Sequence, residues 1–471
     1  MTTTTTAADS FGRLRRILGV GFGLAVNIGS MIGVGILRSP GLVAGHLHTV
    51  AMILAVWILG GLYTLVGASC MTELGALLPQ AGGYYVYARR AFGDRVGFAV
   101  GWTDWITYCA VLGYVSIGMS EFLAQLVPAA AGAQRAIAIA ILVGFVGLQW
   151  AGVRISSWFQ EWTTALKFLA FLGLVVAALV VSGAGGHAEG TGADVTFVRV
   201  APLTLSGLVA ALQVVTITYA GWQSALYFTE EDRDPVKNLP RAMIGGVIAV
   251  IAIYLLVNLA LVAIVPIPDL ARATLPAAEA ASRIAGPRGG QIIILLSLIS
   301  LPPLLNAILM IGTRILFALG RDGLLWPRLA AVNPRGTPGF ATLATTAVAI
   351  VLIATGTFER LVALTAFYLA FNYAAACLAL VVLRRREPSL PRPLRAWGYP
   401  WSAGIVVAGA LAFLIGVVIA DTRAAVIAVG LLAIGLVLHA VLPRRWRSGA
   451  PPAPPPAASV PTARVVDRSD R

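Results

Sequence analysis

Long apolar runs recur along most of this chain, and they constrain its fold more than any other feature of the sequence. Runs of about 17 to 25 apolar residues can cross the hydrocarbon core of a bilayer as a helix. Because 58% of the residues are hydrophobic and 11% are charged, an ordinary soluble globule is excluded. We expect an all-α integral membrane protein with twelve transmembrane helices, near residues 17–44, 50–72, 96–126, 136–152, 160–182, 205–229, 242–265, 291–318, 340–356, 361–383, 402–420 and 424–442.

The basic residues indicate how these helices are oriented. Alternate loops carry 21 Lys and Arg on the side that holds both chain ends, against 8 on the opposite side. Cytosolic loops are enriched in these residues, so we expect both termini to be cytosolic. The net charge of +14 does not predict nucleic-acid binding, because the basic residues form short clusters between apolar runs. The preference for Arg over Lys and for Ala favours a high-GC bacterial genome, and hence a bacterial inner (plasma) membrane.

Three glycines and a serine within Gly29-Ser30-Met31-Ile32-Gly33-Val34-Gly35 are expected to unwind the first helix. Inside a membrane, the unpaired N–H and C=O groups of such a break are tolerated where they line a polar cavity or contact a ligand. The half-helix after the break directs N–H groups toward a carboxylate, and the carbonyls of the half-helix before it suit an ammonium. The alternative is that Gly29 and Gly33 form a small-xxx-small packing motif.

The sixth run is interrupted in a similar way over residues 216–224, where four hydroxyl side chains, a glycine and a glutamine stand among apolar residues. Two such interruptions are typical of transporters built from inverted repeats, with the substrate site between the halves. We therefore expect a 5+5 inverted repeat with broken helices 1 and 6. The predicted divisions are a disordered N-terminal tail over 1–11, a first five-helix repeat over 12–200, a second over 201–390, helices 11 and 12 over 391–443, and a disordered Pro/Ala-rich tail over 444–471.

Several motifs resemble those of the amino acid–polyamine–organocation superfamily. The stretch Gly29–Ile36 is similar to its first-helix motif, and the residues at and after the second break resemble its L-type amino acid transporter branch. The segments that carry the remaining likeness are Tyr219–Gln223, Phe228–Glu231, Asp234-Pro235, Lys237–Ala242, Gly82–Tyr87, Arg314–Ala318, Arg321–Gly323 and Leu383–Pro388. The resemblance covers roughly residues 12 to 445. It implies a LeuT-type fold and amino acid transport by alternating access.

The resemblance also implies a substrate site at the two breaks. The substrate carboxylate is expected to bind the backbone N–H groups of Gly33, Val34 and Gly35. The substrate ammonium is expected to bind the carbonyls of Met31, Ile217 and Ala220. The other residues that the resemblance assigns to this site are Ile32, Tyr219, Gly221, Trp222, Gln223, Asn372 and Tyr373.

Some of these assignments have alternatives. The L-type branch often has a gating aromatic where this chain has Ile217, so either the lid over the substrate is looser or Tyr219 takes that role. Trp222 is alternatively a packing aromatic. Asn372 and Tyr373 alternatively bond neighbouring helices to each other.

Lys167 is one of two lysines among the 34 basic residues, and it lies inside the fifth apolar run. An ionisable group is expensive there and usually faces the protein interior. In transporters of the resembled family, a lysine at this place takes the position that sodium occupies in sodium-coupled relatives. We therefore expect Lys167 to be the coupling residue and transport to be independent of sodium. The alternative is that its side chain snorkels to the cytosolic interface.

The remaining polar residues give weaker predictions. Asp104 and Glu121 in the third run either relay protons or form paired structural carboxylates. The acidic cluster over 230–234 forms either an inner gate or a structural ion-pair network. The four histidines lack metal-ligand spacing, so no metal or other cofactor is expected. The three cysteines lie in apolar runs and none lies in the loop over 127–134, so no disulfide-linked partner subunit is expected.

Together these features predict a sodium-independent secondary transporter of neutral zwitterionic amino acids, either proton-coupled or exchanging. No charged residue lies among the expected pocket positions, which favours neutral side chains. The alternatives are a polyamine or organic-amine permease of the same superfamily, and an amino acid sensor that does not transport. An enzyme is not expected, because no catalytic or metal constellation converges at one depth. The expected partners are an amino acid substrate and membrane lipid.

Overall fold

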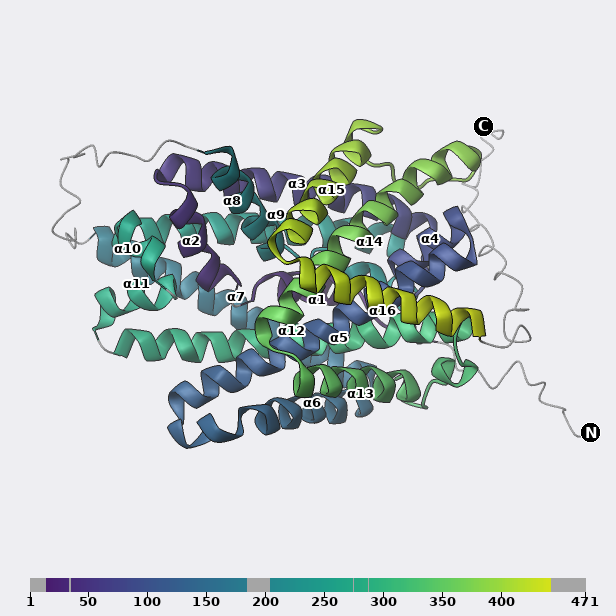
Figure 1. Cartoon of the computed structure of the whole chain (residues 1–471), viewed down its shortest axis with the longest axis horizontal. Helices are drawn as coiled ribbons and strands as arrows, with labels where there is room; N and C mark the ends of the chain where they lie inside the picture. The colour runs from purple at the N-terminus through teal and green to yellow at the C-terminus, as the bar shows by residue number, and fades with distance from the viewer. Residues whose placement is uncertain (1–13, 34, 184–203, 274, 287, 442–471) are drawn as a thin grey trace, which may run out of the picture.

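The computed structural model describes residues 14–33, 35–183, 204–273, 275–286 and 288–441 (Figure 1). The predicted tails over 1–11 and 444–471 lie outside these residues. Each of the twelve predicted runs coincides with a helix or with a pair of segments. These elements are α1 (Val20–Met31) with α2 (Gly35–His46), α3 (Val50–Leu77), α5 (Asp94–Leu126), α6 (Gln134–Trp150), α7 (Val153–Gly183), α8 (Leu205–Thr218) with the 3-10 helix η3 (Ser224–Phe228), α9 (Pro235–Ile264), α12 (Arg288–Arg321), α13 (Gly339–Thr355), α14 (Phe358–Arg386), α15 (Trp401–Ala420) and α16 (Thr422–Val441).

The lengths of these helices test the predicted number of membrane spans. Among the described residues, nine helices are long and apolar enough to cross a membrane, and the bent pair of α1 and α2 makes a tenth. The apolar helices α8 and α13 are shorter, with 14 and 17 residues. The prediction of an all-helical chain with membrane-spanning helices is confirmed, while the total of twelve spans stays a prediction.

Several helices extend beyond the apolar run that predicted them. α7 begins at Val153 rather than near residue 160, and α14 continues to Arg386. Apolarity marks the part of a helix that lies in hydrocarbon, whereas the helix ends where its free N–H and C=O groups find other partners. At the start of α14, for example, the side chain of Thr357 accepts a hydrogen bond from the N–H of Arg360 at 3.4 Å. A further helix, α4 (Tyr84–Phe92), has no counterpart among the predicted runs.

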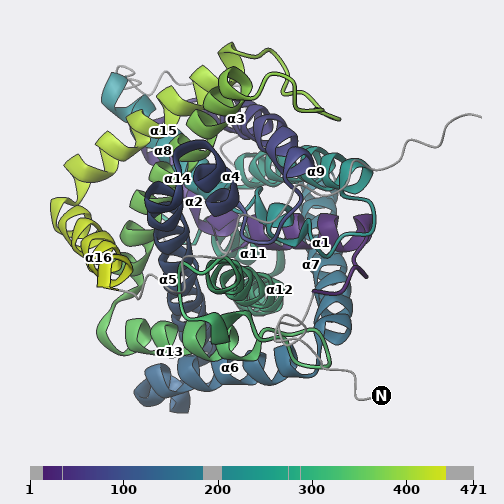
Figure 2. The same cartoon turned by 90° about the vertical axis from the view of Figure 1, so that its right-hand side faces the viewer.

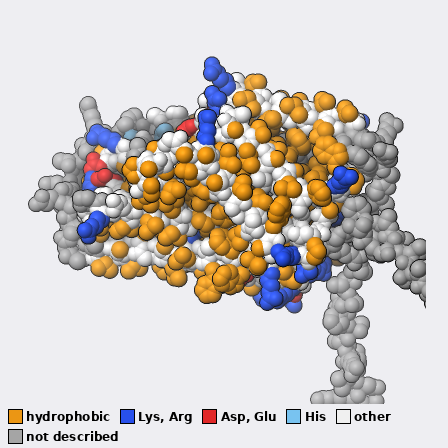
Figure 3. Space-filling model, turned by 90° about the horizontal axis from the view of Figure 1, so that it is seen from below, with side chains coloured by type: hydrophobic (Ala, Val, Ile, Leu, Met, Phe, Trp, Pro, Cys, Tyr) orange, Lys and Arg blue, Asp and Glu red, His pale blue; other side chains and the backbone are white. Residues whose placement is uncertain are grey.

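The helices form one bundle around α12. Figure 2 shows α12 in the middle of the bundle, with α6 and α13 along one side and α15 and α16 at an edge. α12 packs against α1, α5, α7 and α13. Hydrophobic side chains cover most of the face drawn in Figure 3. Such an apolar surface is what contact with hydrocarbon requires.

Two short helices, α10 (Ile267–Arg272) and α11 (Pro276–Ala285), join α9 to α12 and lie on α2. A Cβ atom on Gly41 of α2 would lie 2.6 Å from Pro276 Cγ and 2.8 Å from Leu270 O, so the contact is direct. Arg283 links the two helices through Asp269 at 2.9 Å and also contacts Glu279 at 3.0 Å. Hydrogen bonds from its guanidinium to Asp269 and Glu279 raise the pKa of Arg283.

Candidate functional site

The two interruptions of the helices lie against each other. α1 and α2 are inclined by 44° across the first break, and Tyr219–Gln223 form the turn between α8 and η3. In that turn Gly221 has a φ of +107°, and a Cβ atom there would lie 2.8 Å from both the carbonyl carbon and the oxygen of Ser30. A Cβ atom on Gly35, at the other end of the first break, would lie 3.3 Å from Thr218 Cγ2. At Gly221, only glycine permits this approach of backbone to backbone.

Three predicted residues of the first break, Met31, Ile32 and Gly33, are buried among neighbouring helices, whereas Gly35 at the start of α2 is exposed. α1 ends as the N–H of Ile32 donates to Ile28 O at 3.0 Å. A Cβ atom on Gly33 would be 3.4 Å from Leu304 of α12, so this glycine faces the central helix. Val34 lies outside the described residues. The backbone of Gly33 and Gly35 therefore lies where α1, α2, α8 and α12 meet.

The second break contains its own backbone hydrogen bonds. The N–H of Ala220 donates to Ile217 O at 3.0 Å, which occupies one lone pair of the carbonyl predicted to meet the ammonium. The hydroxyl of Tyr219 donates to Trp57 O of α3 at 3.2 Å. The Tyr219 side chain is fully buried, whereas that of Ile217 is 38% exposed. Of the two candidates for a lid, Tyr219 lies inside the bundle and Ile217 lies toward its surface.

Lys167 reaches the first break from α7. Its side chain is 0% exposed, and its Nζ donates to Gly29 O at 2.9 Å. One turn before this carbonyl, Ala25 O accepts hydrogen bonds from Gln160 at 3.3 Å and Thr164 at 3.1 Å. A polar face of α7 therefore follows the last turns of α1, and Nζ of Lys167 lies at the break rather than at an end of α7.

Tyr254 of α9 contacts both breaks, and the sequence did not single it out. Its hydroxyl lies 2.7 Å from Met31 O and 3.0 Å from Thr218 O, the carbonyls of the last residues of α1 and α8. Its ring packs against Trp57 at 5.4 Å and Tyr219 at 4.9 Å between centroids. A single tyrosine within an apolar helix is the one sequence signal for this residue, and that signal is also typical of core packing.

Trp222, Gln223 and Tyr373 come together as the sequence predicts. Gln223 accepts from the Tyr373 hydroxyl through Oε1 at 3.1 Å and donates from Nε2 to the Tyr108 hydroxyl at 3.3 Å. The rings of Trp222 and Tyr373 lie 5.2 Å apart. These contacts connect the second break to α14 and α5. The amide of Gln223 has both ends fixed, so its orientation is set by the two tyrosines.

Asn372 faces a different neighbour from Tyr373. Its Oδ1 accepts a hydrogen bond from the Thr103 hydroxyl of α5 at 3.0 Å, which matches the alternative of a bond between helices. Its Nδ2 has no hydrogen-bond partner among the residues that the structure describes. The buried amide is thus anchored at one end only.

Asp104 of α5 contacts a tyrosine that packs against Tyr108, the partner of Gln223. The carboxyl is 2% exposed, and its Oδ2 accepts from the Tyr227 hydroxyl at 2.8 Å. The ring of Tyr227 packs edge-on against Tyr108 at 5.4 Å. Glu121 is an exposed residue 17 positions along α5, about 25 Å away at the rise of a helix. The two acids therefore lie far apart on α5, and both alternatives, a proton relay and paired structural carboxylates, stay predictions.

The acidic cluster after the second break is tied to α12 by ion pairs. Glu231 binds Arg314 at 2.9 Å, and both side chains are fully buried. Further pairs at this end of the bundle are Glu230 with Arg321 at 2.6 Å, Arg89 with Asp322 at 2.9 Å, and Glu73 with Arg384. These pairs join α3, α4 and the segment after η3 to helices far away in the sequence. Both predictions for the acidic cluster, an inner gate and a structural network, require such ion pairs.

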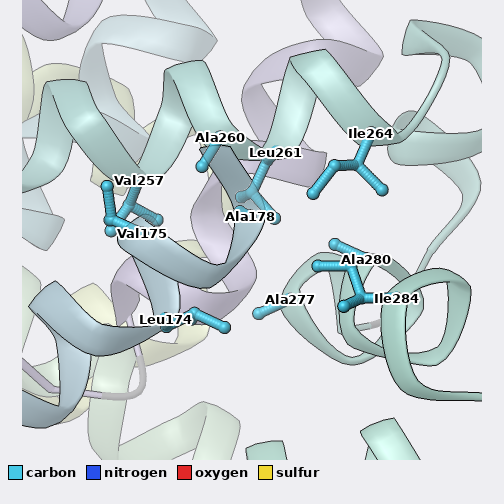
Figure 4. A pocket seen from close by; sticks show the side chains of 10 residues that line it. All are labelled: Leu174, Val175, Ala178, Val257, Ala260, Leu261, Ile264, Ala277, Ala280 and Ile284. Atoms are coloured by element: carbon cyan, nitrogen blue, oxygen red, sulfur yellow. The ribbon is translucent and has the colours of Figure 1, made fainter. Parts of the chain in front are cut away.

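A second pocket is not suited to an amino acid, and no metal site is found among the described residues. A pocket between α7, α9 and α11 is lined by ten aliphatic side chains, among them Leu174, Val257 and Ile284, and offers nothing to bind a charged group (Figure 4). In the described part of the chain, no three His, Cys, Asp or Glu side chains are placed to hold a metal ion. Polar groups of α1, α7, α8 and α9, in contrast, meet at the two breaks.

Comparisons with known proteins identify the family of this chain. Residues 23–440 match the model of a family described as amino acid permease. The chain is 28% identical over 414 residues to the serine/threonine exchanger SteT of Bacillus subtilis (strain 168), covering 87% of this chain and 92% of that protein.

Two mammalian relatives are similar over slightly shorter lengths. The Asc-type amino acid transporter 1 of Mus musculus is 29% identical over 389 residues, or 81% of this chain and 73% of that protein. The b(0,+)-type amino acid transporter 1 of Homo sapiens is 27% identical over 392 residues, or 81% and 79%. These relatives are transporters and not enzymes. Since the family model matches most of the chain and the motifs at both breaks resemble the same superfamily, this chain belongs to the amino acid permease family.

Proposed function

We propose that this protein carries neutral zwitterionic amino acids across the membrane by alternating access, with the substrate bound where the two breaks meet. The observation that carries the proposal is the contact of Gly221 with Ser30, which brings the backbone groups of both breaks to one place. N–H groups at the start of α2 suit a carboxylate, and carbonyls at the ends of α1 and α8 suit an ammonium. Trp222, Gln223 and Tyr373 then bound the side-chain pocket.

The substrate class is supported by the relatives. One is named for exchange of serine and threonine, and the others are named as amino acid transporters. A neutral pocket that contains the amide of Gln223 and the hydroxyl of Tyr373 suits small side chains, including those with a hydroxyl. Small neutral amino acids are therefore the proposed substrates, and exchange is the proposed mode, with proton symport as its competitor.

The architecture proposed for this function is the LeuT-type 5+5 repeat. It places twelve spans in the membrane, with the first repeat over 12–200, the second over 201–390 and two added helices over 391–443. Both termini are proposed to be cytosolic, because basic residues dominate the loops on the side of the chain ends. The membrane is proposed to be a bacterial inner membrane, because the chain prefers Arg over Lys and is rich in Ala. The three cysteines are buried, so a single chain without a disulfide-linked subunit is proposed.

Lys167 is the proposed substitute for a sodium ion. Its ammonium lies on Gly29 O, at the end of the half-helix that precedes the first break. A cation in that position neutralises the free carbonyl end of the half-helix and holds the break open. Transport is therefore proposed to be independent of sodium.

Uptake by proteoliposomes tests these proposals. Purified wild type and Lys167→Ala would be compared for uptake of labelled serine, with sodium or choline outside, with and without an inward proton gradient, and with and without unlabelled serine inside. Equal uptake in sodium and choline that requires internal serine supports an exchanger. Uptake that rises with the proton gradient in wild type, but not in Lys167→Ala, supports a symporter.

Two outcomes would contradict the proposal. Uptake that requires sodium would exclude the assigned role of Lys167. Binding of serine with no flux under any of these conditions would replace the transporter with a sensor.

A further inference from the structure

A groove opens at the end of the molecule where α1 and α7 begin. Its volume is about 770 Å³, and none of its lining residues is among the candidate residues of the substrate site. Three segments form it: the residues just before α1, the loop after η3 and the first turns of α7. The lining residues are Ile17, Arg154, Ile155, Ser157, Trp158, Glu161 and Arg233.

The groove carries positive charge that the described protein leaves uncompensated. Arg154 and Arg233 are exposed, and neither makes an ion pair with any residue that the structure describes. The carboxylates next to Arg233 are already engaged. Asp232 Oδ1 accepts from Asp234 N at 2.8 Å and Asn238 Nδ2 at 2.7 Å.

Glu161 is the one acidic side chain in the groove lining. Asp234, the other nearby acid, forms an ion pair with Lys237 at 3.1 Å. Two guanidinium groups and one carboxylate leave a net charge of +1 at the groove. A phosphodiester, with a single negative charge, balances it.

The apolar part of the groove continues along the outside of α7. Trp158 and Trp162 are each 61% exposed, and their rings lie 6.1 Å apart. Ile155, Leu166 and Leu169 are also exposed and follow at helical spacing on the same side. Exposed tryptophans are typical of the interface between headgroups and hydrocarbon. These side chains form an exposed apolar stripe on α7, which runs from the arginines toward the depth at which acyl chains lie.

We propose that this groove binds an anionic phospholipid, with its phosphodiester between Arg154 and Arg233 and one acyl chain along the exposed stripe of α7. Basic pockets between helices at the cytosolic surface recognise lipid headgroups in this way. The hydroxyls of a glycerol headgroup can donate to Glu161. Phosphatidylglycerol fits both the charge and these donors.

Such a lipid would connect the two breaks to α7. The N–H of Leu18 donates to Glu231 O at 3.0 Å, and the N–H of Arg233 donates to Leu18 O at 3.1 Å, so the start of α1 and the loop after η3 form one unit. Arg233 belongs to this unit and Arg154 belongs to α7. A phosphate shared by the two arginines therefore holds the ends of both broken helices on α7.

The binding test is a titration of the full-length protein in detergent with phosphatidylglycerol, followed by native mass spectrometry. Each arginine near an anionic headgroup contributes about five-fold in affinity. We expect Arg154→Gln and Arg233→Gln each to weaken binding by about that factor, and Arg154→Lys to retain it. Arg395→Gln is the matched control, because Arg395 is exposed, lacks an ion pair with described residues and precedes the exposed Trp397, but lies outside the groove. Selective retention of phosphatidylglycerol over phosphatidylcholine and phosphatidylethanolamine supports the proposal.

Other results would overturn it. Equal binding by wild type and both Gln variants, or an equal loss in Arg395→Gln, would remove the groove as the site. Equal retention of the zwitterionic lipids would remove the role of charge. Displacement of the lipid by inorganic phosphate at millimolar concentration would make the arginines a site for free anions. None of these readouts depends on transport, so the proposal stands or falls separately from the proposed function.

Discussion

One hydroxyl joins the two breaks. Tyr254 Oη lies within hydrogen-bond distance of Met31 O and Thr218 O, but a phenol has a single proton to donate. At any moment one of the two carbonyls lacks a partner from Tyr254. In the proposed function, the carbonyl without this partner is free to accept from the substrate ammonium, while the hydroxyl keeps the ends of α1 and α8 together.

Tyr254→Phe removes this hydroxyl without changing the ring. A net hydrogen bond contributes about 1 kcal/mol, so we expect KM for the transported amino acid to rise about five-fold. Tyr63→Phe is the control, because its hydroxyl donates to Val406 O of α15 at 3.0 Å and not to a carbonyl of either break. Uptake kinetics should show the increase in KM for Tyr254→Phe alone, and an equal increase in both variants would show that the effect is structural.

Gly221 is constrained by its backbone and by its neighbour. Its φ of +107° and the 2.8 Å separation of a Cβ atom from Ser30 both exclude a side chain. We expect Gly221→Ala to abolish uptake and to lower the midpoint of thermal unfolding. Gly93→Ala separates the two causes, because Gly93 has a φ of +88° and nothing within 4 Å of its Cβ position. Gly93 has a ψ of 178°, so that control should lose only a backbone term of about 1–3 kcal/mol and keep its transport. Unimpaired uptake by Gly221→Ala would contradict the close contact of the breaks.

At the scale of elements, the segment after the second break is held to α12 by a buried ion pair. Glu231 and Arg314 are both fully buried, and Arg314 also donates to Met310 O at 3.3 Å. Desolvation makes such a pair a weak source of stability, but the loss of one partner leaves the other charge without compensation. The pair therefore fixes the position of the segment that follows η3, although the intact pair itself adds little to the free energy of unfolding.

Glu231→Gln tests this. We expect it to cost about 3–5 kcal/mol, measured as a lower yield of folded protein and a lower unfolding midpoint in detergent. Glu387→Gln is the control, since its partner Arg90 has 44% of its side chain exposed and such pairs contribute less than about 1 kcal/mol. The double variant Glu231→Leu with Arg314→Met should recover stability. If the double variant also transports at the wild-type rate, the pair is structural and not a gate.

The sequence predicted the helices better than it predicted their partners. Apolar runs indicated each helix because hydrocarbon excludes charged residues, but α4 mixes tyrosines with arginines and has no such run. Lys167 was predictable because an ionisable group is rare in an apolar run. Its acceptor is 138 residues away, and Asn306 of α12, which donates to Gln160 at 2.9 Å and accepts from Gln149 at 2.7 Å, gave no signal at all. Such partners depend on how distant helices pack, which local patterns do not contain.

At the scale of the whole molecule, charge and apolar surface together set its place in the bilayer. In the predicted twelve-span topology, basic residues number 21 on the side of the chain ends and 8 on the other. Between these ends the outer helices expose large apolar side chains to lipid. If the chain crosses the membrane twelve times, the loop before α6 and the loop after α14 must lie on opposite sides.

Cysteine labelling in intact cells checks this topology. Cys70, Cys109 and Cys377 are free and buried, so the wild type should react little with a membrane-impermeant maleimide. Ala131, before α6, and Ser389, after α14, are both exposed positions in loops. We expect Ala131→Cys to be labelled in intact cells and Ser389→Cys to be labelled only after the membrane is permeabilised, because positively charged loops stay in the cytosol. Labelling of Ser389→Cys alone in intact cells would show that the orientation is the reverse of the predicted one. Labelling of both positions in intact cells would show that the number of spans between them is even and not odd.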